Sequence, residues 1–335
     1  MSNDTTTKQL QRIPKDKSNE LERIAIENEK KGTALHPSAS STQAQIIQFP
    51  ETRENQVELI RAQDVPVMPI SWLWPGYLAL GKVHILCGSP GVGKSTLALK
   101  FAASTSTGVG WPDESLTSHG NVVIWSGEDD PADTLVPRLI LSGARTDRVF
   151  IVGNTMDIES GGKRPFRPDI DIPFLQKRIR ETGNVKLLIV DPLVSAVLGD
   201  SHKNADVRQS LQTLVDLAAE EGVAVLGISH FSKSTRGREP LERVTGSLAF
   251  GALARIVMVC SKQADTDARI FCRAKSNIGA DDGGFEYSIL QAALPDNPAV
   301  ANSFAQWGKP VDGTARDILA TAELNRTGFG GDKIN

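Results

Sequence analysis

The sequence predicts an α/β fold in which helices cover both faces of a doubly wound, mainly parallel sheet. Between residues 83 and 230, five short apolar stretches alternate with helix-favouring segments, a pattern typical of such sheets. From residue 254 on, three strand-like stretches are joined by short turns, which predicts an antiparallel extension of the same sheet. The composition is 40% hydrophobic and 23% charged, near the globular average, so a core of this size can be buried.

The 335 residues divide into three parts. Residues 1–55 are polar, and we interpret them as a disordered leader, although a segment that orders on a partner would have the same composition. Residues 56–292 hold the alternating elements. Residues 293–335 are expected to be a polar tail with one short helix at 317–324.

The expected elements follow one another in order. The strands are expected at 83–87, 121–125, 148–152, 185–191, 223–230, 254–260, 268–272 and 285–290. The helices are expected at 96–103, 132–142, 172–181 and 206–221, with a loop at 154–171. Because ligands of a doubly wound sheet collect at the carboxyl ends of its parallel strands, residues just after these strands are candidates for a functional site.

The stretch after the first strand matches G-x-x-x-x-G-K-[ST] at every fixed position. Its residues are Gly88, Ser89, Pro90, Gly91, Val92, Gly93, Lys94, Ser95 and Thr96. Glycines let the backbone turn its N–H groups toward a polyanion, and the following helix adds its positive amino terminus. Lys94 is expected to reach the β- and γ-phosphates and Ser95 to ligate Mg²⁺. A chance glycine-rich turn is disfavoured, because a strand and a helix flank the motif as its chemistry requires.

Two strand-end acids complete the expected nucleotide site. Asp191 ends a continuously apolar strand, which suits an acid that holds Mg²⁺ through water; alone, it could equally cap a turn. Pro192 rather than a glutamate follows it, so the residue that orients the attacking water must come from another strand. Glu128 is the candidate because it reaches further than Asp129 and Asp130, which we interpret as the acidic first turn of the next helix.

His230 ends the fifth strand and is expected to contact a phosphate or the water, although a lone strand-end histidine is more often structural. The following loop, 233–243, is either a solvated loop or a polyanion-binding segment. Its basic residues are Lys233, Arg236, Arg238 and Arg243.

Further cations flank the later strands. Arg255 lies at the first of them, and Arg273 and Lys275 are two residues apart, which places them on one face of a strand. They could serve a nucleotide on a neighbouring subunit or keep a sheet edge from aggregating. Before the first strand, residues 72–82 hold two Trp, a Tyr and a Pro-Gly pair. We favour packing of these rings on the sheet over a wall for the nucleotide base.

Composition excludes several classes of protein. The formal net charge is −3, so any contact with nucleic acid must come from a local patch. The three cysteines lie in apolar runs without C-x-x-C spacing, as expected of reduced thiols in a cytoplasmic protein. No run approaches the roughly 18 apolar residues of a membrane span, and no signal peptide is visible.

Together these motifs resemble the RecA-type P-loop ATPases over residues 56–291. More narrowly, they resemble the branch of plasmid- and phage-encoded AAA family ATPases that includes the replicative helicase RepA. The matching residues are Gly88–Thr96, Glu128-Asp129, Asp191, His230–Lys233, Gly246-Ser247 with Arg255, and Lys275–Asn277.

The resemblance implies a RecA-like core that forms a ring or filament, often a hexamer, with ATP between subunits. It implies that Glu128 is the catalytic glutamate and His230 the sensor. It also implies that Arg255 acts on a neighbouring subunit's nucleotide with support from Lys275. The loop after His230 corresponds to the segment that meets single-stranded DNA in relatives.

Three functions follow from the motifs. We favour a helicase-type ATPase motor in the replication of a mobile element. The alternative is an ATP-driven assembly or regulatory switch without unwinding, because no helical amino-terminal domain of the DnaB kind, primase or zinc motif accompanies the core. A small-molecule kinase ranks last, since no substrate lid or acceptor base stands out.

Overall fold

The computed structural model describes residues 59–157, 161–201, 203–232, 239–243, 248–263 and 267–324. Its contacts divide the chain into two units, residues 1–66 and 67–335. The first unit contributes one 3-10 turn, η1 (Ala62–Asp64). The expected leader, residues 1–55, lies outside the described residues.

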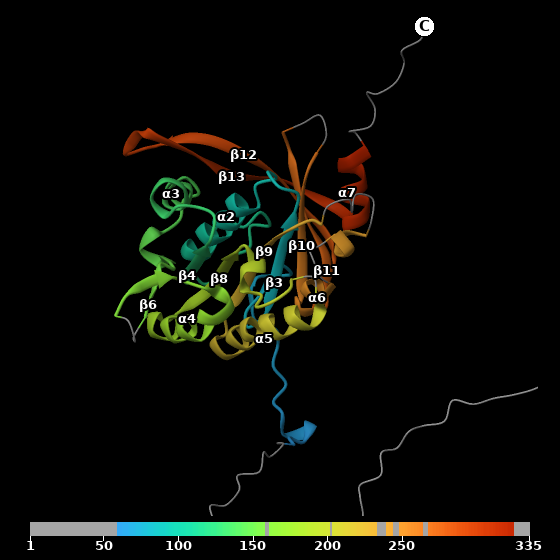
Figure 1. The fold of residues 1–335 in the computed structure, drawn as a ribbon. Helices are drawn as coiled ribbons and strands as arrows, with labels where there is room; N and C mark the ends of the chain where they lie inside the picture. The colour runs from blue at the N-terminus through green and yellow to red at the C-terminus, as the bar shows by residue number, and fades with distance from the viewer. Residues whose placement is uncertain are drawn as a thin grey trace, which may run out of the picture. The chain divides into compact units, whose positions relative to one another are not determined.

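The second unit is built on a nine-stranded sheet of order β13-β12-β11-β10-β3-β9-β8-β4-β5, drawn in Figure 1. Six neighbouring strands run parallel: β3 (Val83–Gly88), β4 (Asn121–Ser126), β5 (Val149–Ile151), β8 (Val185–Asp191), β9 (Ala224–His230) and β10 (Ile256–Lys262). Three strands extend this sheet in antiparallel fashion: β11 (Arg269–Ser276), β12 (Asp282–Leu294) and β13 (Asn297–Thr314). The fold class expected from the sequence is therefore confirmed.

Three details differ from the sequence-based expectation. β10 pairs in parallel with β3, so the antiparallel extension begins one strand later than expected. The expected polar tail contains β13, the longest strand of the sheet, which pairs with β12 over almost its whole length. The short ribbon of β6 (Asn154–Met156) and β7 (Lys163–Pro165) lies within the expected loop, and β1 (Trp72–Trp74) pairs with β2 (Leu78–Ala79) before the sheet begins.

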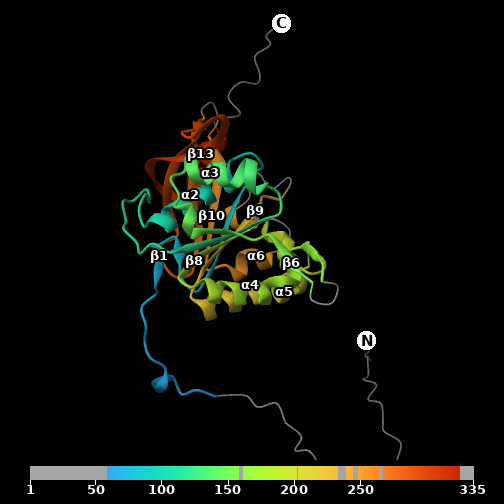
Figure 2. The same ribbon diagram turned by 90° about the vertical axis from the view of Figure 1, so that its left-hand side faces the viewer.

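Helices cover both faces of the sheet, as Figure 2 also shows. One face carries α2 (Lys94–Thr107) and α3 (Val136–Leu141), the latter preceded by the π-helical turn η2 (Pro131–Leu135). The other carries α4 (Pro168–Thr182), α5 (Asn204–Glu221), α6 (Leu248–Leu253) and α7 (Ala315–Leu324). Short 3-10 turns complete the connections at η3 (Thr146–Arg148), η4 (Leu193–Ala196) and η5 (Pro240–Arg243). In the described part of the chain, no helix is long and apolar enough to cross a membrane.

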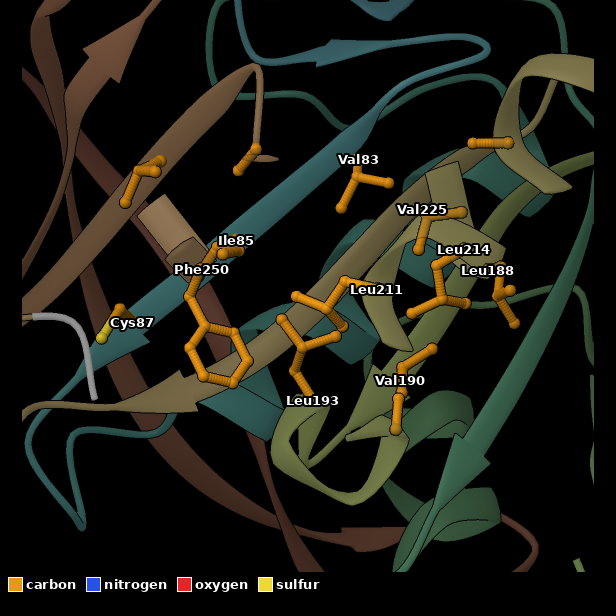
Figure 3. Packing of buried hydrophobic residues seen from close by; sticks show 14 of the residues in the cluster. Val83, Ile85, Cys87, Leu188, Val190, Leu193, Leu211, Leu214, Val225 and Phe250 are labelled. Carbon is orange, nitrogen blue, oxygen red and sulfur yellow. The ribbon is translucent and has the colours of Figure 1, made fainter. Parts of the chain in front are cut away.

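The core forms because successive side chains of a strand point to opposite faces. Along β3, Val83, Ile85 and Cys87 belong to the cluster under α4 and α5, whereas Leu86 belongs to the cluster under α2. Figure 3 shows the first cluster, in which Leu211 and Leu214 of α5 pack onto the strands. Two buried layers thus fix the ends of the parallel strands relative to one another.

The aromatic turn before β3 is part of the second buried layer. Trp74 is fully buried and stacks on Tyr77 at 4.0 Å and on Trp111 at 4.7 Å between ring centroids. Its indole N–H donates to Asp113 over 3.0 Å. This contact pattern agrees with the favoured interpretation of the rings as packing residues.

Candidate functional site

The phosphate-loop motif lies between the end of β3 and the start of α2. Gly91 and Gly93 have φ angles of +76° and +86°, which side chains rarely adopt. A Cβ on Gly88 would come within 2.5 Å of the carbonyl oxygen of Cys260 on β10. The amino terminus of α2 begins at Lys94, directly after this loop, which is the arrangement that binds a phosphate group.

Lys94 reaches back across the loop. Its Nζ donates to the carbonyl of Ser89 over 3.1 Å and lies 3.1 Å from Nδ1 of His230. The side chain is 5% exposed, and burial lowers the pKa of its amine. An ammonium group has no acceptor, so Nδ1 of His230 must accept this hydrogen bond.

His230 is therefore a neutral imidazole with its hydrogen on Nε2. Burial and then the charge of Lys94 lower the pKa of His230, which keeps the ring neutral near pH 7. The residue ends β9 in register with Gly88 of β3. The ring therefore lies beside the phosphate loop, with a hydrogen-bond donor on Nε2.

Ser95 and Asp191 form the second contact of the site. The Ser95 hydroxyl donates to Oδ2 of Asp191 over 2.6 Å. Burial raises the pKa of Asp191 to about 6, while the hydrogen bond from Ser95 opposes the shift and Glu128 adds to it. A buried carboxyl group beside a hydroxyl group is a set of hard oxygen ligands suited to a small divalent cation.

The oxygen ligands fit Mg²⁺ bound together with phosphates. Within the described residues, no group of three or more His, Cys, Asp or Glu side chains could hold a metal ion. Mg²⁺ needs fewer protein ligands, because water and phosphate oxygens complete its coordination. Ser95 and Asp191 are the residues that would hold it here.

The acidic turn after β4 carries three carboxylates, Glu128, Asp129 and Asp130, and each makes different contacts. Asp130 caps η2 by accepting from the backbone N–H groups of Ala132 and Asp133 over 2.7 and 3.2 Å. Asp129 forms an ion pair with Arg138 at 3.1 Å. Glu128 is exposed, and its negative charge acts on Lys94, Asp191 and His230. Asp130 is therefore committed to the cap and Asp129 to an ion pair, although Asp129 also raises the pKa of Asp191. Glu128 is the acid of this turn whose charge acts on Lys94, Asp191 and His230 alike.

Arg255 and Lys275 lie away from the strand ends that carry the phosphate loop. The backbone N–H of Arg255 donates to Val83 at the start of β3, whereas the phosphate loop follows Gly88 at its end. A five-residue separation along a strand is roughly 17 Å. Arg255 is therefore not positioned to act on the nucleotide site of its own chain, and the amine of Lys275 is held by the carbonyls of Gly251 and Ala254.

The expectation that Arg273 and Lys275 share a face is wrong. A β-bulge opposite Val257 and Met258 breaks the alternation, because a bulge adds one residue to one strand of the pair. The Arg273 guanidinium lies 4.4 Å from the centroid of the Tyr77 ring. Lys275 donates to the carbonyls of Gly251 and Ala254, at the end of α6 on the other face.

The basic loop is described only at its end. Lys233, Arg236 and Arg238 lie outside the described residues, as does the Gly246-Ser247 pair. Arg243 is 5% exposed, and its guanidinium lies 4.3 Å from the centroid of the Phe231 ring. Arg243 therefore anchors the end of the loop, and its contact with nucleic acid stays a prediction.

Sequence reasoning missed the residues that β12 contributes to the phosphate loop. The Tyr287 hydroxyl donates to the carbonyl of Val92 over 2.8 Å. A Cβ on Gly93 would come within 2.8 Å of Ile289. No motif marks these contacts, because 195 residues separate Tyr287 from Val92.

Comparison with known proteins gives one family match. The family model described as "AAA domain" matches residues 48–236, a range that contains the phosphate loop, Glu128, Asp191 and His230. No curated protein matches the chain. Among solved structures, the crystal structure of the RadB recombinase is similar at 17% identity, covering 65% of this chain and 91% of that one, with a TM-score of 0.46. The topology described above, rather than this distant likeness, establishes the fold.

Proposed function

The chain belongs to the AAA domain family, and on that premise we propose that it is an ATP-hydrolysing motor that acts on DNA as a homo-oligomer. The observation that carries the proposal is the hydrogen bond of 2.6 Å from Ser95 to Asp191. It lies beside the 3.1 Å contact between Lys94 and His230. A cation, a neutral donor and a pair of Mg²⁺ ligands thus meet at a helix amino terminus, as phosphoryl chemistry requires.

The proposed mechanism assigns one task to each of these residues. The backbone of the loop and Lys94 bind the phosphates, and Lys94 exchanges its contacts with Ser89 and His230 for phosphate oxygens. Mg²⁺ held at Ser95 and, through water, at Asp191 supplies charge neutralisation when it is bound. Glu128 orients the attacking water, and Nε2–H of His230 donates to the water or to the terminal phosphate.

The position of Arg255 and Lys275 supports an oligomer. Arg255 lies at the end of the strands remote from its own phosphate loop, and Lys275 is held by the carbonyls of Gly251 and Ala254, so a role in hydrolysis requires a neighbouring subunit. We propose a ring, of the hexameric kind found in the family that the sequence resembles. Within the described residues the three buried cysteines form no disulfide, which suits a reducing compartment such as the cytoplasm.

The DNA-binding part of the proposal rests on the basic loop after His230. This loop begins three residues after His230, whose Nδ1 lies 3.1 Å from Lys94, so a change at the phosphates can reach the loop through His230. We propose that it binds single-stranded DNA and that the motor serves a helicase-type role in replication of a mobile element.

The alternative is an ATP-driven switch that assembles without unwinding DNA. The deciding experiment measures ATP hydrolysis with and without single-stranded DNA, and strand displacement on the same preparation. The motor proposal expects stimulation by DNA together with displacement, and Lys94→Ala should abolish both. Hydrolysis at the same rate with and without DNA, and without strand displacement, would favour the switch. Undiminished hydrolysis by Lys94→Ala would contradict the assignment of the nucleotide site.

A further inference from the structure

The hairpin of β12 and β13 contacts both sides of the nucleotide site. Figure 1 shows it, in orange and red, passing over α2 and α3, and contacts of β13 with both helices agree with that view. The phosphate loop lies at the start of α2, and the turn that carries Glu128 lies just before η2 and α3. One hairpin thus touches two segments that hydrolysis needs in a fixed relation.

The contact with the turn runs through a chain of side chains. Oδ1 of Asn302 on β13 accepts from Nε of Arg138 over 3.0 Å. Nη1 of the same guanidinium donates to Asp129 over 3.1 Å. Nδ2 of Asn302 donates to the carbonyl of Asp133 over 2.8 Å. Asn302 therefore joins the hairpin to η2 directly and, through Arg138 of α3, to the acidic turn.

The two charged side chains of this hydrogen-bonded series, Arg138 and Asp129, are partly shielded from water. The side chains of Arg138 and Asp129 are 21% and 24% exposed, so their interaction is screened less than that of a surface pair. The planar guanidinium binds both partners at once, with Nε on one and Nη1 on the other, which fixes its orientation. A lysine at this position could not hold both partners in the same geometry.

Asp129 is the immediate neighbour of Glu128, so its position limits that of the glutamate. The backbone of this turn is also held by the N–H of Gly127, which donates to the carbonyl of Asp191 over 2.8 Å. The Ser126 hydroxyl accepts from the N–H groups of Glu128 and Asp129 over 3.4 and 3.1 Å. The longer of these bonds is at the limit of a useful hydrogen bond. The ion pair to Arg138 adds a restraint on the side chain of Asp129, directly after Glu128.

We propose that Asn302 is a positioning residue for hydrolysis: through Arg138 and Asp129 it holds Glu128 where it can orient the attacking water. This inference rests on the proposed ATPase function. A displacement of about 1 Å in a group that orients a reactant can lower a rate by about 100-fold. Loss of Asn302 should thus slow turnover while leaving the phosphate loop, and so nucleotide binding, intact.

The test compares Asn302→Ala with Gln306→Ala in the full chain. Gln306 is an exposed amide on the same strand, so its replacement controls for a change in the hairpin alone. We expect kcat to fall about tenfold or more in Asn302→Ala, with KM for ATP within about twofold of the original chain, and no change in Gln306→Ala. Arg138→Lys should reproduce the loss, because it keeps the charge but not the two-sided contact.

A double-mutant cycle separates positioning from general loss of structure. Asp129→Asn and Asn302→Ala should together lower kcat no more than the stronger single variant, because both break one chain of contacts. Thermal melting of each variant shows whether it is folded. If Asn302→Ala does not fold, Arg138→Lys takes its place as the test variant. Unchanged kcat in a folded Asn302→Ala, or a raised KM with unchanged kcat, would overturn the inference alone. A parent chain without Lys94-dependent hydrolysis would overturn the proposed function and this inference with it.

Discussion

The hydroxyl of Ser95 at the start of α2 donates a 2.6 Å hydrogen bond to the carboxylate of Asp191 at the end of β8. The two strands that lead to these residues are not neighbours, because β9 lies between β3 and β8. The sheet topology therefore creates the pair of oxygen ligands, and burial of Asp191 makes its charge costly without a cation beside it.

Replacing Ser95 should weaken the use of Mg²⁺. Ser95→Ala removes an oxygen ligand, so we expect the Mg²⁺ concentration for half-maximal hydrolysis to rise about 10- to 100-fold. Ser95→Thr is the matched control, because threonine supplies the same hydroxyl. A titration of hydrolysis with Mg²⁺ measures the effect, and equal curves for Ser95→Ala and the parent chain would exclude the assigned ligand.

Arg255 should act on a neighbouring subunit. Arg255→Ala is expected to reduce hydrolysis by about 1,000-fold, the contribution of an arginine that meets the transition state. Mixing it with Lys94→Ala should restore measurable hydrolysis, because some interfaces then combine an intact Lys94 with an intact Arg255. A mixture no more active than its two components would contradict the shared site.

Neutralising the basic loop should remove the response to DNA. The triple change of Lys233, Arg236 and Arg238 to Ala is expected to abolish stimulation of hydrolysis by single-stranded DNA. It should also reduce the slope of log affinity against log salt by about 2, since each lost phosphate contact contributes about 0.7. Arg178→Ala, which removes an exposed cation of α4, is the control. Unaltered stimulation in the triple variant would favour the switch.

Asp171 should stabilise the fold in a pH-dependent way. It is fully buried and accepts from both Nη atoms of Arg164 over 2.6 and 2.7 Å, and this contact lowers its pKa from 3.8 to about 2. A lowered carboxyl pKa stabilises the folded state above pH 4 and loses that effect as the pH falls toward 2. Asp171→Asn should therefore cost about 2 kcal/mol at pH 7 and about half as much at pH 3.

Urea unfolding at the two pH values measures this difference. Asp147→Asn is the control, because Asp147 pairs with Arg145 at the surface and surface pairs contribute little. An equal loss of unfolding free energy by Asp171→Asn at both pH values would show that the carboxylate charge is not what stabilises the ribbon of β6 and β7 against α4.

The sequence predicts the site where local rules suffice. Lys94, Ser95 and Asp191 come together because parallel strands deliver their ends to one edge, a rule that needs only strand order. β13 was missed because Pro298 and Pro310 interrupt it, and prolines argue against a strand. The predicted face of Lys275 was wrong, because side chains no longer alternate strictly between the two faces of a sheet at a bulge. Tyr287 and Asn302 were missed because their partners are distant in the sequence and polar contacts at such range leave no periodic signal.

The central claim is that Glu128 drives ATP hydrolysis at this phosphate loop, and single-turnover hydrolysis by Glu128→Gln tests it most directly. Asp130→Asn is the matched control, because it changes an acid to an amide in the same turn and asparagine still caps a helix. We predict that Glu128→Gln binds ATP about as tightly as the parent chain and hydrolyses it at least about 100-fold more slowly, while Asp130→Asn keeps its rate. Hydrolysis by Glu128→Gln at the parent rate would contradict the account.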